Sequence, residues 1–172
     1  MNPLSSIVRN RLTWSKIPST PHYELKINEE TTGILSRPSC WSPRFLAETR
    51  DGCWVFRRQG FLGTGVEITD ADSEEPIARF KSSSGGGGRL IFTDGQGFWL
   101  KYKGWWRPVW TVSTDDGQPA LEVHTRENIV ELRASAGIPS TRLSLLITFC
   151  WSRVLQADED ASAASIAAMT AA

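Results

Sequence analysis

Apolar and polar residues alternate along most of the chain, and the alternation has a period of two. Tyr23, Leu25 and Ile27 are separated by Glu24 and Lys26, which is the pattern of a β-strand with one buried face. Similar runs occur at residues 45–49, 53–57, 65–69, 77–81, 89–93, 98–102, 109–113, 120–124 and 129–133. Turn signals separate these runs, among them Asp-Gly pairs at 51–52, 94–95 and 116–117. Because no helical pattern lies between the runs, the spacing predicts an antiparallel all-β fold.

One segment near the C-terminus has a different pattern. Residues 143–155 read L-S-L-L-I-T-F-C-W-S-R-V-L, apolar on nearly every side, and such a helix must be buried or lie in a membrane. Its uncharged part, Leu143 to Ser152, is about half of the roughly 20 residues that a bilayer crossing needs. Ser140 or Thr141 can cap it after Pro139. We therefore expect a core helix over about 141–156, with Trp151 enclosed by a closed sheet that has no free edges.

The pattern divides the chain into three parts. Residues 1–20 show little periodicity and are expected to form an N-terminal arm, with a short strand near Leu12 to Trp14 left open. Residues 21–157 form the barrel with its central helix, and 158–172 are an acidic, then alanine-rich tail. Within the barrel, residues 66–80 resemble 110–123, since each reads as strand, acidic turn, proline and strand.

Charge and cysteine content narrow the function classes. The 172 residues suit one domain and carry 19 basic and 19 acidic side chains, which argues against a general electrostatic grip on nucleic acid. The three cysteines, at 40, 53 and 150, form no C-x-x-C pair, so a reducing compartment is favoured over a disulfide framework. The first residues lack the apolar run of a signal peptide. We expect a cytoplasmic protein without a transmembrane segment.

Three segments carry a family resemblance. Residues 52–61 fit G-x-W-x-F-x-R-x-G-F, the two similar hairpins resemble a repeated "strand, D-x-x-G-x-P-L, strand" unit, and the late helix running into D-E-D-A-S-A-A is similar to an "LLLLGWYL…D…AAA" ending. Together, over residues 14–164, they resemble uncharacterised bacterial proteins with a tubby C-terminal-like, LURP-one-related fold. The resemblance implies an antiparallel β-barrel closed around a hydrophobic C-terminal helix.

The resemblance implies two functional alternatives. The first is a non-enzymatic binding or structural module whose partner is unknown. The second is a peripheral membrane protein that binds phospholipid or phosphoinositide, since tubby proteins bind phosphoinositides through basic residues on the barrel surface. No basic cluster matching the tubby motif is visible in the sequence, and the segment from Phe149 to Arg153 departs from the family's G-W-Y-L. Arg153 is expected to emerge at the barrel mouth or to pair with an acid.

One basic and aromatic segment is a candidate for binding an anionic lipid or a protein partner. It consists of Lys101, Lys103, Trp105, Trp106 and Arg107. Aromatic rings beside cations suit stacking or a lipid interface. The alternative is that one tryptophan packs inward and the other lies beneath the aliphatic parts of the lysine side chains. This alternative is favoured, because aromatic side chains contribute much of the packing energy of protein cores.

Other residues with catalytic or binding chemistry do not form a recognisable motif. His22 and His124 belong to no H-E-x-x-H or similar pattern, so we expect no enzyme, cofactor or metal. The acidic turns lack the ligand spacing of a calcium loop and read as turns that bond their own backbone. Ser82 to Gly88 lacks the Gly-Lys-Ser/Thr ending of a phosphate loop and reads as a hairpin connection.

Overall fold

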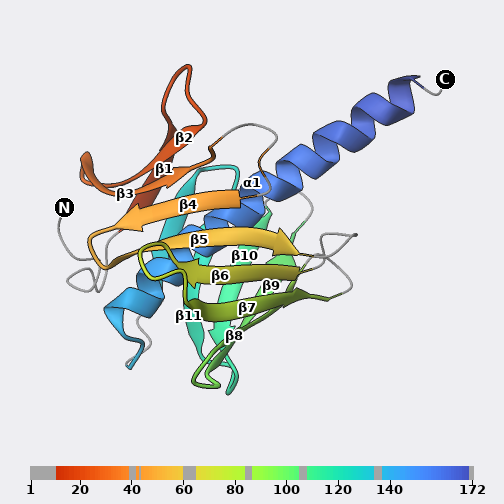
Figure 1. Cartoon of the computed structure of the whole chain (residues 1–172). Coiled ribbons are helices and arrows are strands. Elements are labelled where there is room, and N and C mark those ends of the chain that lie inside the picture. Colours follow the sequence, from red (N-terminus) through yellow and green to blue (C-terminus); the bar gives the residue numbers. More distant parts are fainter. Residues whose placement is uncertain are drawn as a thin grey trace.

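The protein is a closed antiparallel β-barrel built around one helix (Figure 1). The computed structural model describes residues 11–38, 42, 44–59, 65–83, 87–104, 108–133 and 137–170, except for the side chains of 163–170. Its elements in chain order are β1 (Arg11–Lys16), β2 (His22–Ile27), β3 (Glu30–Ser36), β4 (Arg44–Thr49), β5 (Gly52–Gln59), β6 (Gly65–Asp70), β7 (Pro76–Ser82), β8 (Gly88–Phe92), β9 (Gly97–Lys103), β10 (Val109–Thr114), β11 (Pro119–His124), β12 (Ile129–Leu132) and α1 (Ser140–Thr170). The predicted fold class is confirmed.

Each strand pairs with the next along the chain, and β1 pairs with β12 to close the barrel. Consecutive connections therefore alternate between two ends. We call the end with the β2–β3, β4–β5, β6–β7, β8–β9 and β10–β11 turns the bottom, which lies on the left in Figure 1. The other end is the top.

The expected boundary between arm and barrel at residue 21 is wrong, because β1 is a barrel strand. Its register with β12 joins Arg11 to Glu131 and Thr13 to Ile129. Leu12 and Trp14 point inward and are almost fully buried. The short strand considered near Leu12 to Trp14 is therefore present. The apolar side chains of Leu12 and Trp14 explain why the barrel closes with this strand.

The central helix is enclosed on every side, as its apolar sequence predicts. Phe149 packs against Phe56 of β5 and Phe80 of β7, with ring centroids 5.4 and 5.2 Å apart. Trp151 stacks on Trp14 of β1, with centroids 5.2 Å apart and ring planes 12° from parallel. Strands on separate sides of the barrel thus contact one turn of α1, so the helix fills the lumen.

Two of the buried hydroxyl residues of α1 bond within the helix itself, while the Ser144 hydroxyl donates to Asp51 in the β4–β5 turn at 2.5 Å. The Thr148 hydroxyl donates to the carbonyls of Ser144 and Leu145, and the Ser152 hydroxyl donates to that of Phe149. Such bonds to preceding turns satisfy small hydroxyls inside a helix. The lumen therefore accepts these residues without an unpaired hydroxyl.

Ion pairs hold α1 at both ends of the barrel. Near its start, Arg142 contacts Asp94 and Gln96 in the β8–β9 turn at the bottom. At the top, Glu159 accepts two hydrogen bonds from Arg37, at 2.6 and 2.8 Å, and Asp160 accepts from Arg58. The helix thus runs through the barrel from bottom to top.

The helix is longer than the sequence predicts. We expected its end near residue 156, but it spans 31 residues and continues to Thr170, about 46 Å at 1.5 Å per residue. A six-residue strand spans about 20 Å, so α1 extends beyond the top, as Figure 1 shows. Alanine favours helix, which explains why the alanine-rich region continues the helix. The structure contains no helix apolar enough over a sufficient length to cross a bilayer, within the part of the chain that it describes.

Arg153 lies near the top, partly buried. Its guanidinium is 5.2 Å from the centre of the Phe80 ring and donates to Gln156. Burial lowers the pKa of this guanidinium. Among the described residues no carboxylate forms an ion pair with it, so of the two alternatives expected for Arg153, a place near the barrel mouth is the one observed.

The two similar hairpins share a structural irregularity. In β6–β7 the register shifts between Ile68 and Thr69, and Thr69 then faces Pro76. In β10–β11 it shifts after Val112, and the next pair joins Ser113 to Pro119. In both, proline begins the second strand, where its missing N–H is tolerated. The sequence similarity therefore corresponds to a repeated bulged hairpin.

Candidate functional site

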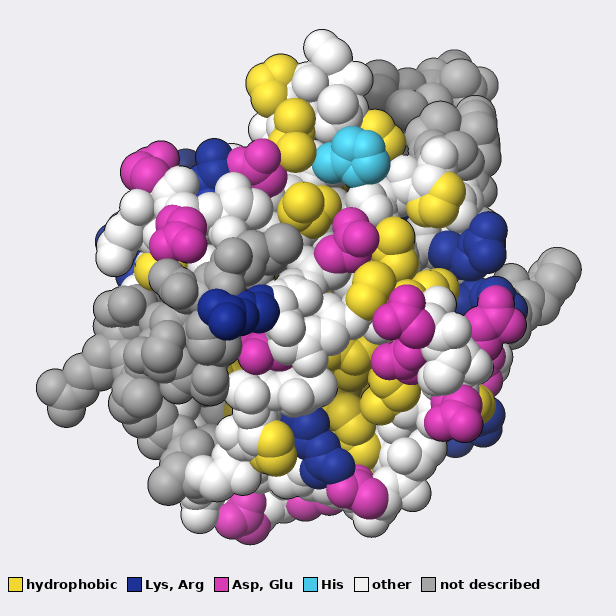
Figure 2. All heavy atoms as spheres, turned by 60° about the vertical axis from the view of Figure 1, so that its left-hand side comes forward, with side chains coloured by type: hydrophobic (Ala, Val, Ile, Leu, Met, Phe, Trp, Pro, Cys, Tyr) yellow, Lys and Arg dark blue, Asp and Glu magenta, His cyan; other side chains and the backbone are white. Residues whose placement is uncertain are grey.

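Charge is distributed unevenly along the barrel axis although the net charge is zero. Every turn at the bottom carries at least one acidic residue: Glu29, Asp51, Asp72, Asp94 and Asp115 stand in the five turns. In Figure 2 the side on the left of Figure 1 comes forward, and acidic side chains are spread over it. The bottom of the barrel is therefore its acidic end.

The acidic turns are held by their own backbones. Asp70 accepts hydrogen bonds from the backbone N–H groups of Ser73 and Asp72, at 2.9 and 3.0 Å, and these bonds lower the pKa of its carboxyl. Asp94 accepts from the N–H of Gln96, at 3.1 Å. These carboxylates stabilise tight turns, as the sequence predicts.

The outer face of β7, β8 and β9 is basic. The three strands contain no acidic residue and carry five cations, which are Arg79, Lys81, Arg89, Lys101 and Lys103. We call this surface the cationic face. Among the described residues, no acidic side chain forms an ion pair with Lys81, Lys101 or Lys103, whereas Arg79 pairs with Glu67 and Arg89 with Asp115.

The structure places only part of the predicted basic and aromatic segment. Lys101 and Lys103 are exposed at the top of β9. Trp105, Trp106 and Arg107 lie outside the described residues. The structure therefore supports the exposure of the two lysines and leaves the rest of the segment as a prediction.

Large apolar side chains are exposed beside these cations. Among the described residues, the large apolar side chains with the greatest exposure are Ile91, Trp99 and Tyr102, at 39%, 38% and 45%. All three belong to β8 and β9. Ile91 and Trp99 lie on the outer face, while Tyr102 is at the rim against Trp110. The cationic face thus combines positive charge with exposed apolar surface.

Strand register brings these residues together. Lys81 pairs with Arg89 across β7 and β8, and Arg89 pairs with Trp99 across β8 and β9. The Arg89 guanidinium lies 5.7 Å from the Trp99 ring centre and bonds Asp115 at 2.6 and 3.0 Å. Beside this row, a groove is lined by the apolar residues Pro76, Ala78, Ile91 and Phe92, by Thr93, and by the charged residues Glu67, Arg79 and Lys81. The face can therefore contact anionic and apolar groups at once.

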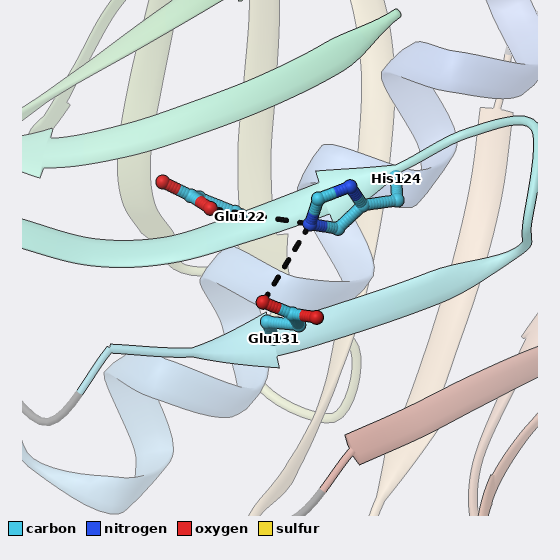
Figure 3. Close-up of side chains that lie close together, drawn as sticks. All are labelled: Glu122, His124 and Glu131. Carbon is cyan, nitrogen blue, oxygen red and sulfur yellow. Dashed lines mark ion pairs between the residues drawn. The ribbon is translucent and has the colours of Figure 1, made fainter. Parts of the chain in front are cut away.

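A second cluster lies two strands away, on the outer face of β11 and β12. Figure 3 shows Nε2 of His124 between the carboxylates of Glu122 and Glu131, with its distances to the two Oε2 atoms 3.9 and 3.7 Å. The three ligand atoms lie within 4.8 Å of one another. Arg133 bonds Glu122 at 2.8 Å and lies 3.6 Å from Glu131. We call Glu122, His124 and Glu131 the carboxylate–histidine cluster.

The sequence alone does not predict the full cationic face or the carboxylate–histidine cluster, because the pairing of strands brings their residues together. Lys81, Arg89 and Lys101 are far apart in sequence, so no basic run announces them. Glu122 and His124 are two residues apart, a spacing that places both on one face of a strand. Glu131 joins them through the β11–β12 register, in which it directly faces Glu122. Outward positions compared across a predicted hairpin are the signal that would have found this cluster.

Comparison of the chain with protein-family models, with curated proteins and with solved structures finds no match in any of the three.

Proposed function

We propose that this protein is a non-enzymatic binding module of the tubby-like barrel class that attaches to anionic phospholipid surfaces. The observation that carries the proposal is the cationic face, where five cations and no acid occupy three neighbouring strands. A basic barrel surface is also what the resemblance to tubby-like proteins implies for lipid binding. A cytoplasmic membrane leaflet, which is negatively charged, is the surface that we propose.

The arrangement of side chains suits an interface better than a catalytic cleft. Lys101 and Lys103 can approach headgroup phosphates, while Trp99 and Ile91 present apolar surface between and beside the cations. Tryptophan suits the headgroup level because its ring is amphipathic. An anionic surface repels the acidic bottom and attracts the cationic face, so the barrel approaches it with that face forward.

The free energy of membrane binding can be estimated from the number of cations that have no ion-pair partner among the described residues. Each lysine or arginine near an anionic membrane contributes about 1 kcal/mol. Removal of Lys101 and Lys103 should therefore weaken partitioning by about 2 kcal/mol, roughly thirtyfold. The attraction also weakens with salt, since the Debye length is about 10 Å at 0.1 M and about 3 Å at 1 M.

Co-sedimentation with vesicles tests the proposal. The full chain should bind vesicles that contain phosphatidylserine at low salt and should be released at high salt, while vesicles of phosphatidylcholine alone should not bind it. The double variant Lys101→Ala, Lys103→Ala should lose most of the binding. The matched control, Arg11→Ala with Lys26→Ala, removes two charges from β1 and β2 and should bind like the wild type. Absence of binding to anionic vesicles at low salt would reject the lipid proposal and favour a protein partner.

A further inference from the structure

The carboxylate–histidine cluster raises an electrostatic question. Glu122 and Glu131 face each other directly across two strands, and like charges in that position destabilise a sheet. One oxygen of each carboxylate lies near Nε2 of His124, and the three atoms are within 4.8 Å of one another (Figure 3). Arg133 supplies one cation to this pair, at 2.8 Å from Glu122 and 3.6 Å from Glu131, and a metal ion is another cation that makes such a pair favourable.

The histidine faces the same point. Nε2 of His124 is itself shielded from solvent and has no hydrogen-bond partner within the described part of the chain. This nitrogen lies 3.9 Å from a carboxylate oxygen of Glu122 and 3.7 Å from one of Glu131. These distances are too long for hydrogen bonds, so the present contacts leave the nitrogen's bonding capacity unused.

We propose that Glu122, His124 and Glu131 form a binding site for a divalent transition-metal ion, and that zinc fits it. Zinc takes imidazole nitrogen and carboxylate oxygen at about 2.0–2.2 Å, which places tetrahedral ligand atoms about 3.3 Å apart. The nitrogen–oxygen separations of 3.9 and 3.7 Å therefore need to close by about half an ångström. The three residues supply three ligands, and water would take the fourth position of a tetrahedral ion.

Imidazole distinguishes this site from one for calcium or magnesium, which prefer oxygen ligands alone. The backbone holds the three residues rigidly, because all of them lie on the paired strands β11 and β12 rather than on loops. This rigidity supports the proposed metal site. The side chains of His124, Glu122 and Glu131 are 28%, 25% and 39% exposed, while Nε2 itself is shielded, so neighbouring side chains must shift for an ion to bind.

Arg133 is the competing cation. It bonds Glu122 at 2.8 Å and approaches Glu131 at 3.6 Å, and hydrogen bonding to Glu122 raises the pKa of its guanidinium. Half of its side chain is exposed, so it can move aside at little cost. The ion would then take the place between the carboxylates while Arg133 retains contact with the outer oxygen of one of them.

Zinc titration of the chelator-treated, untagged full chain tests this site. Isothermal calorimetry with zinc chloride should show one ion bound per chain, and cobalt(II) should give a visible spectrum of low-symmetry coordination. His124→Gln and Glu131→Gln each remove one ligand. Loss of an outer-sphere partner already costs a metal site roughly ten- to hundredfold in affinity, so each variant should bind zinc at least tenfold more weakly.

The chain offers a matched control, because it has two histidines. His22→Gln should bind zinc like the wild type, and circular dichroism should show that every variant is folded. The proposal is overturned if the wild type binds no zinc, or if His124→Gln and Glu131→Gln bind it as tightly as the wild type does. The latter result would place the ion elsewhere on the chain. The titration needs no lipid, so its outcome is independent of the vesicle experiment.

Discussion

The variant Trp151→Ala tests the central helix most directly. Trp151 is 3% exposed and stacks on Trp14, with ring centroids 5.2 Å apart. Its replacement by alanine removes the buried ring, ends the stacking and leaves a cavity that the surrounding strands can only partly close. Such changes cost about 3–5 kcal/mol, out of a total stability of about 5–15 kcal/mol for a domain.

Urea unfolding followed by far-ultraviolet circular dichroism measures this loss without depending on tryptophan fluorescence. The melting temperature should also fall by roughly 6–20 °C, given about 2–4 °C per kcal/mol for a chain of this size. Trp99→Ala is the matched control, because it is the same substitution on the outer face of β9. It should cost less than about 1 kcal/mol.

A double-mutant cycle isolates the stacked pair. Trp14→Ala alone should also destabilise the barrel strongly, and the double variant should lose less than the sum of the two single losses. The coupling expected for an aromatic pair is about 0.5–1.5 kcal/mol. If Trp151→Ala unfolds within about 1 kcal/mol of the wild type, or no more easily than Trp99→Ala, then α1 does not fill the lumen.

Three further predictions concern the helix and its surroundings. Truncation after Asp160 removes residues 161–172 but keeps both ion pairs at the top, so the urea midpoint should change little; a chain that no longer folds would show that this segment is needed. Hydrogen bonding to Arg142 lowers the pKa of Asp94 below its ordinary value of 3.8. Its contribution to stability is therefore complete above that value and is lost as the pH falls through the lowered pKa, so Asp94→Asn should flatten the acid side of a stability-against-pH curve between about pH 5 and pH 1. Burial raises the pKa of the Cys150 thiol to about 12, so iodoacetamide followed by peptide mass mapping at neutral pH should modify Cys150 in urea but not in the native protein.

The strands with strong turn signals could be predicted from sequence, and others could not. The sequence pattern does not predict β3, because Gly33 interrupts the alternation of apolar and polar residues. A Cβ atom at position 33 would lie only 3.2 Å from the methyl group of Thr49 on β4. The β2–β3 turn also lacks an Asn-Gly signal. Asn28 and Glu29 both adopt positive φ, 46° and 68°, as a two-residue hairpin turn of this type requires. The close approach of the neighbouring strand favours glycine at position 33, and the propensity of the local sequence does not reveal that approach.

The candidate sites depended on information that only pairing supplies. The basic character of Lys101 and Lys103 was visible in sequence, whereas the contribution of Lys81 and Arg89 required the register of β7, β8 and β9. Likewise, His124 had no nearby partner in any motif. Chemistry that is assembled across strands is invisible to patterns that read along one segment.

The position of α1 in the chain has a consequence for biosynthesis. The helix follows all twelve strands in sequence, yet it supplies the surface against which they bury their inner faces. Until it has been synthesised, each hairpin exposes an apolar face, and β1 also waits for β12 to close the barrel. Contacts between such distant segments form slowly, and partly folded chains with exposed apolar surface aggregate. The barrel is therefore completed only after translation has passed the helix, and a nascent chain paused before α1 is prone to aggregate.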